Sequence, residues 1–288
     1  MRDALSAAVD GMTAAGVPDA RLDAELLLSE ATGRERAALI ADPAAELPAP
    51  AARAFGEMVR RRLRREPVAY ILGRKGFRHL DLEIDNRVLV PRPETEMLVE
   101  VALERDAGRV LDVGTGSGAI ALAVADELPR CEVTASDTSP RALAVARANA
   151  ARLGLAERVR FLECTLPEDG GFDLVIANLP YVAERDRATL QPELLEWEPR
   201  EAFFAGPDGL DAYRGFIPEC GSLLGRSASE RSAAPRRAAL AVEVGEGQAA
   251  AVGELMRAAG FGAVEIRRDL AGIERIVIGE FGVEPEER

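Results

Sequence analysis

The chain has 288 residues, of which 48% are hydrophobic and 30% charged, so it can bury a core and remain soluble. Its net charge of −13 argues against a surface built mainly to hold nucleic-acid phosphates. No apolar run approaches the roughly 18–20 residues that cross a bilayer, and the acidic N-terminus lacks the apolar block of a signal peptide. We therefore expect a cytoplasmic protein.

The first 75 residues predict a group of helices. Leucines in residues 21–33 recur at helical spacing and are followed by a glycine stop. Residues 51–65 form a second amphipathic segment, and residues 66–73 form a short third one. This part of the chain should therefore fold as a helical unit of its own.

Charge is distributed unevenly along the chain. Residues 1–75 hold 12 basic and 11 acidic residues, whereas the remainder holds 24 and 38. The arginine-rich cluster at residues 60–65 is thus a local basic feature. We interpret it first as the solvated face of a helix, and alternatively as a docking patch for an acidic partner or ribosomal RNA.

From residue 76 the periodicity becomes that of a strand. Leu80, Leu82 and Ile84 alternate with acidic residues, and an Asp85–Asn86 pair follows. Alternation with such a turn predicts a β-hairpin.

Beyond a helix at 91–104, strands and helices alternate to the end of the chain. Strands are expected at residues 108–113, 131–136, 158–163, 172–177, 238–244, 263–268 and 274–280. Helices are expected at residues 117–128, 140–154, 208–220 and 246–260. This order predicts an α/β fold with a mostly parallel, doubly wound sheet, in which the two closing strands pair antiparallel. Residues 225–237, which are small and polar, predict a loop.

The segment RVLDVGTGSGAIALA places a glycine turn between an apolar strand and a helix. Gly114, Gly116 and Gly118 would let backbone amides and a helix N-terminus approach a ligand closely. Asp137 ends the next strand, 23 residues after Gly114, which suits a carboxylate that grips ribose hydroxyls. The pattern indicates a nucleoside cofactor.

The glycine turn alone does not decide which nucleoside is bound, because Gly114, Gly116 and Ala119 also fit the dinucleotide pattern. Asp112 favours S-adenosylmethionine. A carboxylate before the first glycine can meet the methionine ammonium or order the loop, whereas it would oppose a pyrophosphate.

The motif Asn178-Leu179-Pro180-Tyr181 directly follows the fourth strand of the alternating region, at the sheet edge where ligands bind. It suits methyl transfer to an amide or aromatic amine, whose nitrogen lone pair is delocalised and must be drawn out of conjugation and held in line with the methyl group. The Asn178 oxygen and the carbonyl of residue 179 are the expected acceptors for the two N–H bonds. Pro180 would stiffen the turn, and Tyr181 could pack on a planar substrate.

Other residue types point away from other chemistries. The sole histidine, His79, excludes a two-histidine metal site and lies in the hairpin region, so we interpret it as structural. Cys131, Cys164 and Cys220 show no metal-type spacing. They predict buried free thiols in a reducing compartment.

Taken together, these motifs resemble the bacterial release factor glutamine methyltransferases of the HemK (PrmC) type. The resemblance runs nearly end to end. It is carried by VLVPRPETE within residues 66–100, by LDVGTGSGAIALA, by EPREAFFAGPDGLDAYR at 198–214, and by AGFGAVEIRRDLAGIERIVIG at 259–279.

The resemblance implies a helical bundle for substrate docking at residues 1–75, a β-hairpin linker at 76–95 and a class I, Rossmann-like methyltransferase domain at 96–288. It implies methyl transfer from S-adenosylmethionine, leaving S-adenosylhomocysteine, to the side-chain amide N5 of the glutamine in the Gly-Gly-Gln motif of class I peptide chain release factors. That modification tunes translation termination. Neither DNA, a membrane nor a metal is an expected partner.

The resemblance also assigns residues by position. Those expected to bind the cofactor are Asp112, Gly114, Thr115, Gly116, Ser117, Gly118, Asp137, Thr165 and Asn178. Those expected to bind substrate are Asn178, Leu179, Pro180 and Tyr181, and Asn178, Pro180 and Tyr181 are the expected catalytic residues. PRPETE, at 91–96, should shape the pocket.

Two places depart from the family pattern. Leu179 stands where the family has proline, which frees φ and adds an N–H but keeps the carbonyl acceptor. Glu163, Cys164 and Thr165 replace a Ser-Asp pair that is followed by an aromatic residue or leucine. Glu163 is the candidate substitute for the adenine contact.

Two alternative functions stay open. Asn-Leu-Pro-Tyr also resembles the motif of ribosomal RNA adenine N6-methyltransferases, where Tyr181 would stack on a flipped adenine. The acidic catalytic part and the VLVPRPETE block argue against it. The other is a non-catalytic cofactor-binding module that docks on the ribosome or a factor. The intact Asp112, Asp137, Asn178 and Tyr181 argue against it.

Overall fold

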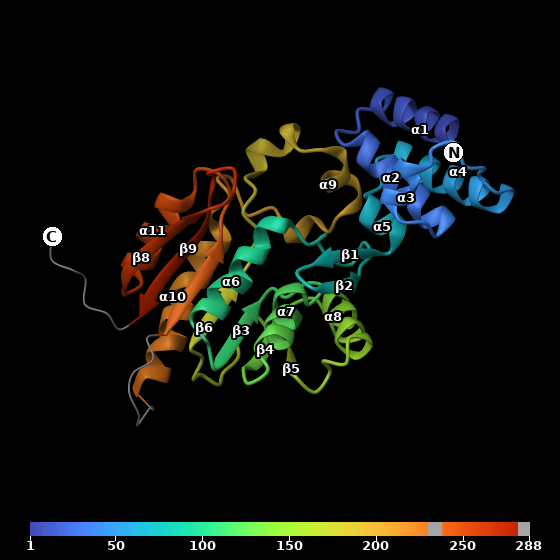
Figure 1. The fold of residues 1–288 in the computed structure, drawn as a ribbon. Helices are drawn as coiled ribbons and strands as arrows, with labels where there is room; N and C mark the ends of the chain where they lie inside the picture. Colours follow the sequence, from blue (N-terminus) through green and yellow to red (C-terminus); the bar gives the residue numbers. More distant parts are fainter. Residues whose placement is uncertain (230–237, 282–288) are drawn as a thin grey trace.

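The computed structural model describes residues 1–229 and 238–281. It has a small helical body at the N-terminus and a larger sheet body, joined by a hairpin and by one long excursion of the chain (Figure 1). In the described residues, no helix combines the length and apolarity needed to cross a membrane.

The helical body, residues 2–72, has its own core. Its helices are α1 (Arg2–Ala14), α2 (Ala20–Thr32), α3 (Arg36–Ala41), α4 (Ala49–Leu63) and α5 (Val68–Leu72). Apolar side chains from all five, including Met12, Leu27 and Phe55, pack together. Gly33 and Gly73 end α2 and α5 in the left-handed conformation. The three helical segments expected from periodicity are confirmed.

A hairpin of β1 (Arg74–Phe77) and β2 (Leu80–Glu83) follows the helical body. The expected hairpin is confirmed, but its strands are joined by a turn at Arg78 and His79. The Asp85–Asn86 turn exists, closed by a hydrogen bond from the Val88 N–H to the Asp85 carbonyl at 3.2 Å, but it follows the hairpin. Arg78 adopts a positive φ of 52°. Its backbone N–H donates to Glu96 and its guanidinium to Glu127, and these tertiary bonds fix the turn.

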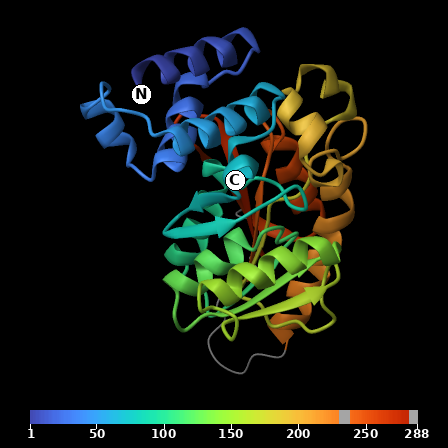
Figure 2. The same ribbon diagram turned by 90° about the vertical axis from the view of Figure 1, so that its right-hand side faces the viewer.

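The hairpin packs on the sheet body rather than hanging free. The side-chain amide of Asn149 on α8 (Pro140–Arg152) accepts from the backbone N–H of Glu83 at 2.8 Å and donates to its carbonyl at 2.9 Å. In Figure 2 the hairpin accordingly lies between the helical body and α8.

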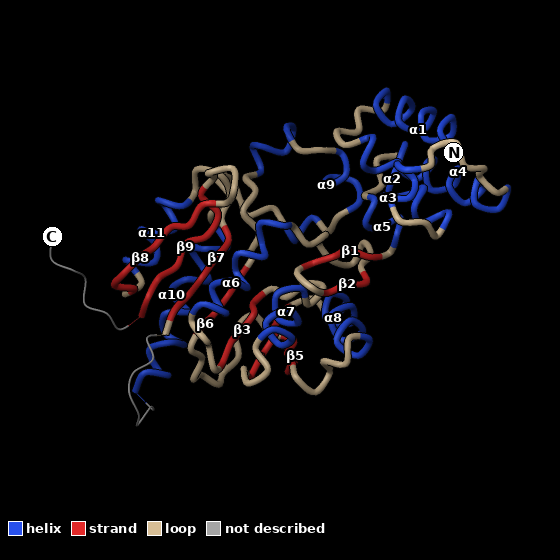
Figure 3. Tube along the Cα trace, in the orientation of Figure 1, coloured by secondary structure: helices blue, strands red, loops and turns tan. Residues whose placement is uncertain are grey.

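Within the described ranges, seven strands form the main sheet, in the order β5-β4-β3-β6-β7-β9-β8. They are β3 (Arg109–Val113), β4 (Glu132–Asp137), β5 (Val159–Glu163), β6 (Leu174–Ala177), β7 (Ala239–Glu243), β8 (Phe261–Arg268) and β9 (Glu274–Phe281). The first five are parallel, and β9 pairs antiparallel with both β7 and β8. Figure 3 shows the strands in red. The expected mostly parallel sheet with an antiparallel end is confirmed.

Helices cover both faces of this sheet. They are α6 (Glu96–Glu104), α7 (Ala119–Glu127), α8 (Pro140–Arg152), α10 (Asp211–Ser229) and α11 (Ala249–Ala258). Neighbouring residues of β3 point to opposite cores, Val110 with α6, α7 and α8, and Leu111 with α10 and α11. Burial on both faces explains why these strands are continuous apolar runs.

Helix α10 corrects one expectation. It continues to Ser229, so the first part of the loop expected at residues 225–237 is helical. The rest of that loop, residues 230–237, lies outside the described residues.

The order of the strands decides where a ligand can bind. From β3 the chain proceeds outward through β4 to β5, then returns to β6 on the other side of β3. In such a sheet the loops after the two central strands diverge and leave a crevice at their carboxyl ends. The loops after β3, β4 and β6 therefore meet at one edge.

The residues between 183 and 205 form an excursion that leaves the sheet body and returns. At its base, Val182 bridges Phe204. It carries α9 (Pro192–Trp197) and short 3-10 turns at Glu184–Thr189 and Arg200–Ala202. Figure 1 shows α9 lying between the two bodies.

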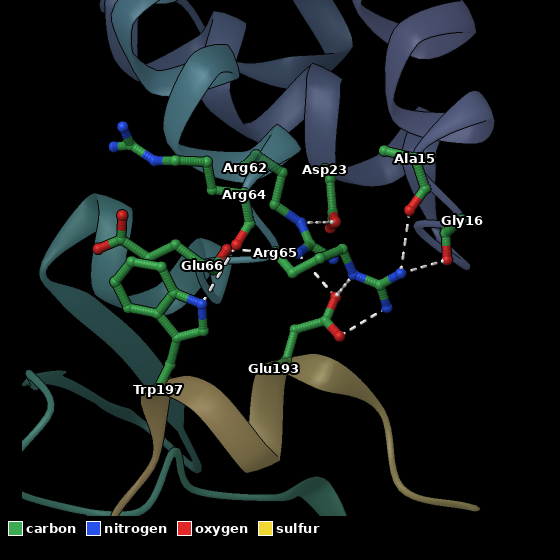
Figure 4. A network of polar contacts seen from close by, with 9 residues as sticks. All are labelled: Ala15, Gly16, Asp23, Arg62, Arg64, Arg65, Glu66, Glu193 and Trp197. Carbon is green, nitrogen blue, oxygen red and sulfur yellow. Dashed lines mark hydrogen bonds and ion pairs between the residues drawn. The ribbon is translucent and has the colours of Figure 1, made fainter.

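Helix α9 is clamped to the helical body by ion pairs (Figure 4). Glu193 accepts from Arg62 at 2.7 Å and pairs with Arg65 through two bonds of 2.7 and 2.6 Å. Arg62 also contacts Asp23 at 2.7 Å, and Trp197 donates its indole N–H to the Arg64 carbonyl at 3.3 Å.

The first interpretation of the arginine cluster was therefore wrong for three of its members. Arg62 is only 5% exposed. Arg61 pairs with Glu66, and Arg65 pairs with Glu193. These arginines stabilise contacts within the chain, and only Arg60 and Arg64 of the cluster are exposed.

Replacing Glu193 by Gln should destabilise the protein by about 3 kcal/mol, because it leaves the largely buried Arg65 without its carboxylate and Arg62 with Asp23 alone. The free energy of unfolding from urea denaturation measures the loss. Glu196→Gln, an exposed change on the same helix, is the matched control and should stay within about 0.5 kcal/mol of wild type. Equal losses in the two variants would contradict the clamp.

Candidate active site

The turn after β3 depends on its glycines. Gly114, Gly116 and Gly118 have φ values of 71°, 57° and 84°, a region that favours glycine. A Cβ at Gly118 would also press on Leu122 at 3.0 Å and Ala146 at 3.3 Å. The turn can therefore bring its backbone amides close to the crevice without side chains in the way.

Asp112 lies under this turn and is fully buried. Its Oδ2 accepts from the Thr115 hydroxyl at 2.6 Å and from the Ala121 N–H at 3.1 Å, so the carboxylate orders the loop. Its Oδ1 is buried without a hydrogen-bond partner among the described residues. Burial, with a smaller contribution from the nearby Asp137 charge, raises the pKa of Asp112 to about 7. A buried carboxylate oxygen that accepts no hydrogen bond is suited to pair with a cationic group of a ligand.

Asp137 is held from two sides at the end of β4. Its Oδ2 accepts from the Gly116 N–H at 2.9 Å, and its Oδ1 accepts from the Ser139 N–H at 2.8 Å. Ser139 in turn caps α8. The carboxylate thus joins two loops while lining the crevice.

The crevice is a pocket of about 290 Å³ at the edge where the loops after β3, β4 and β6 meet. Val88 and Leu89 after the hairpin, and Ala202 from the excursion, complete its wall. Its size lies near the lower limit for small-molecule sites.

Some of the expected cofactor-binding residues line this pocket and others support it from below. Lining residues are Gly114, Gly116, Asp137, Thr165 and Asn178. Asp112, Thr115, Ser117 and Gly118 are not among the lining residues, and the first three are buried beneath the turn.

The three residues at 163–165, which differ from the family pattern, do not all lie in the pocket wall. Cys164 and Thr165 line the pocket, whereas Glu163 is exposed and does not. The thiol of Cys164 is half-buried, which corrects the expectation of three buried cysteines; Cys131 and Cys220 are buried.

Asn178, Leu179 and Pro180 line the pocket directly beside the glycine turn, since a Cβ at Gly114 would lie 3.8 Å from the Asn178 carbonyl and from the Leu179 side chain. The Asn178 Nδ2 donates to the Thr95 hydroxyl at 3.0 Å, and that hydroxyl donates to Glu243 at 2.6 Å. The Leu179 carbonyl accepts no hydrogen bond from another described residue. Two acceptor oxygens of the motif are therefore available to a ligand.

Tyr181, the last residue of the motif, is not among the residues that line the pocket. Its hydroxyl donates to Glu243 at 3.2 Å, and its carbonyl accepts from the Gln248 side chain at 2.9 Å. A Cβ at Gly209 would collide with the Tyr181 carbonyl, so the returning chain packs directly against the motif.

Sequence reasoning missed Glu243 and Gln248, and named Thr95 only as part of a block. Glu243 ends the all-buried strand β7. An acid at the end of an apolar strand is the same signal that identified Asp137, and it could have identified Glu243.

The block at residues 91–96 is attached to the excursion. Glu198 accepts from the Val90 N–H at 3.0 Å and from Arg92 at 2.6 Å. These bonds hold the block beside the pocket, where Thr95 reaches Asn178.

The PrmC N-terminal domain family matches residues 3–73, and the methyltransferase small domain family matches residues 93–198. A methyltransferase from Pyrococcus furiosus aligns with a TM-score of 0.52 at 18% identity, covering 73% of this chain and 92% of that one. The catalytic domain of hMettl16, crystallised with a 3′UTR hairpin, aligns with a TM-score of 0.52 at 14% identity, covering 72% and 77%. The sheet body thus has the class I methyltransferase fold.

Relatives with assigned activity cover almost the whole chain. The release factor glutamine methyltransferase of Caulobacter vibrioides is 41% identical over 283 residues, which is 96% of this chain and 94% of the relative. That of Deinococcus radiodurans is 40% identical over 284 residues, covering 96% and 97%. The chain belongs to the release factor glutamine methyltransferase family.

Proposed function

We propose that this protein transfers a methyl group from S-adenosylmethionine to the side-chain amide nitrogen of the glutamine in the Gly-Gly-Gln motif of class I release factors. The observation that carries the proposal is the pair of acceptor oxygens, on Asn178 and Leu179, beside a pocket that contains the glycine turn. Family membership supplies the reaction class, and this geometry suits an acceptor with two N–H bonds.

S-adenosylmethionine is the cofactor of this family, and the residues that line the pocket or lie beneath its glycine turn fit it. We infer that the unpartnered Asp112 oxygen takes the methionine ammonium, that Gly114 and Gly116 accommodate the methionine end, and that Asp137 binds the ribose. Thr165 would lie along the nucleoside. The bound cofactor supplies a methyl group on a sulfonium, which is an electrophile with a good leaving group.

The residues after β6 would prepare the acceptor. The Asn178 oxygen and the Leu179 carbonyl each accept one N–H of the glutamine amide, which turns the nitrogen lone pair out of conjugation and toward the methyl group. Pro180 restricts the turn that presents these oxygens. Leu179 meets this requirement as proline would, since only its carbonyl is needed.

The helical body is suited to dock the release factor. The Arg62–Glu193–Arg65 clamp ties this body to the excursion that begins right after the Asn178–Tyr181 motif. The distance from the helical body to the pocket is therefore fixed, and a protein bound to the helical body would present its glutamine at that distance. Within the arginine cluster at residues 60–65, the exposed members are Arg60 on α4 and Arg64 at its C-cap.

Asn178→Ala should lower kcat for the release factor about 100-fold, because the amide then lacks one of its two acceptors. Labelled S-adenosylmethionine is incubated with release factor and small-subunit ribosomal RNA in competition, and mass spectrometry locates the methyl group. The melting temperature should remain near that of wild type and serves as the control for folding. Methyl on adenine instead of glutamine would refute the proposed substrate.

Affinity for S-adenosylhomocysteine should weaken as the pH falls below about 7, because the raised pKa of Asp112 leaves it protonated and unable to pair with the ligand ammonium. The raised pKa also affects the stability of the ligand-free enzyme. Between pH 3.8, the ordinary pKa of an aspartate, and about pH 7, Asp112 is protonated in the folded state and ionised in the unfolded state. The free energy of unfolding therefore falls as the pH rises through that range. Titration calorimetry from about pH 5.5 to 8.5 measures the dependence. Asp112→Asn should bind weakly with a flat profile. An unchanged slope in this variant would exclude Asp112.

Reversing both exposed arginines, Arg60→Glu with Arg64→Glu, should raise KM for intact release factor several-fold and leave kcat for a short Gly-Gly-Gln peptide unchanged. Arg53→Glu, also exposed on α4, is the matched control. If the control raises KM equally, the effect is one of net charge and the docking proposal fails.

A further inference from the structure

A chain of side chains runs behind the pocket from Glu243 through Thr95 to Asn178. Glu243 is 2% exposed at the end of β7, and Thr95 is 5% exposed at the start of α6. Glu243 Oε2 and Thr95 Oγ1 are 2.6 Å apart, and Thr95 Oγ1 and Asn178 Nδ2 are 3.0 Å apart. The three residues come from separate segments that meet only in the fold.

The hydrogen positions in this chain follow from the number of donors each group has. A threonine hydroxyl carries one hydrogen, and a carboxylate can only accept. The 2.6 Å separation is typical of an O–H···O⁻ bond, so the Thr95 hydrogen points at Glu243. The Thr95 oxygen then offers only lone pairs to Asn178.

The orientation of the Asn178 amide is thereby decided. A carboxamide has one donating and one accepting end, and only its NH₂ group can face the lone pairs of Thr95. The opposite orientation would place two acceptors against each other. The Asn178 oxygen is consequently the end that remains for the pocket.

The surroundings of Glu243 keep both of its carboxylate oxygens engaged as hydrogen-bond acceptors. Its other oxygen accepts the Tyr181 hydroxyl at 3.2 Å, so both oxygens are occupied by O–H donors. Burial raises the pKa of Glu243, while the two hydroxyls and Arg275 oppose that rise. The same carboxylate thus holds the first and the last residue of the Asn178–Tyr181 motif.

We propose that Thr95 and Glu243 are positioning residues which fix the polarity of the Asn178 side chain, so that its oxygen and not its nitrogen meets the acceptor amide. This inference rests on the proposed function, since an N–H acceptor is needed only if the substrate presents N–H bonds. Neither residue touches the reacting atoms; both act through Asn178.

Three variants isolate this role. Thr95→Val keeps the shape and removes the hydroxyl, and Glu243→Gln keeps the shape and lets an NH₂ group donate to Thr95, which frees the hydroxyl hydrogen to turn toward Asn178. Both should lower kcat for release factor at least tenfold, with S-adenosylhomocysteine affinity and melting temperature near wild type. Thr95→Ser, which restores the hydroxyl, should recover most of kcat.

A double-mutant cycle separates positioning from general support. In an Asn178→Ala background, Thr95→Val should cause little further loss of kcat, because there is no amide left to orient. Full, multiplicative losses in the cycle, or a Thr95→Ser variant as impaired as Thr95→Val, would overturn the inference.

The identity of the acceptor is read independently. Mass spectrometry of the wild-type product decides the proposed function, and the cycle is measured on whichever acceptor is methylated. Methylation of adenine with strong coupling would refute the substrate and retain the positioning role, since an adenine amino group also presents N–H bonds. Glutamine methylation without coupling would support the proposed substrate and refute the positioning role.

Discussion

The structure depends on the reversal of strand order between β3 and β6. Because β4 and β6 flank β3 on opposite sides, three loops end at the same edge, and each contributes a different kind of group. The turn at Gly114 contributes backbone amides, the end of β4 contributes Asp137, and the end of β6 contributes Asn178. No loop alone makes a site, so the chemistry exists only once the parallel pairs of the central sheet have formed.

Around that edge, acids are used more often to hold the protein than to face a ligand. Asp112 orders the glycine turn, Asp137 ties that turn to α8, and Glu198 fixes the block that contains Thr95. Glu243 joins both ends of the motif after β6. The rigidity of the pocket therefore comes from carboxylates accepting short, charge-assisted hydrogen bonds, which hold the irregular loops at defined positions.

Much of this could be read from the sequence, where the signal is local. Apolar periodicity identified most helices and strands, and the acids and amides at strand ends identified Asp112, Asp137 and Asn178. The failures share a cause, which is contact between distant segments. Arg65 looked solvated because Glu193 lies 128 positions away, and the hairpin turn at Arg78 is fixed by acids from other elements. The support behind Asn178 appears only when β7 and α6 converge.

The excursion between residues 183 and 205 is fixed at both ends, by the Val182–Phe204 bridge at its base and by the Glu193 clamp at α9. Under the proposed docking role, this fixed segment sets the distance between the docking surface on the helical body and the pocket. Selection of a target can then depend on reach as well as on local sequence. A glutamine of suitable chemistry would escape modification if its carrier places it at the wrong distance from the docking surface.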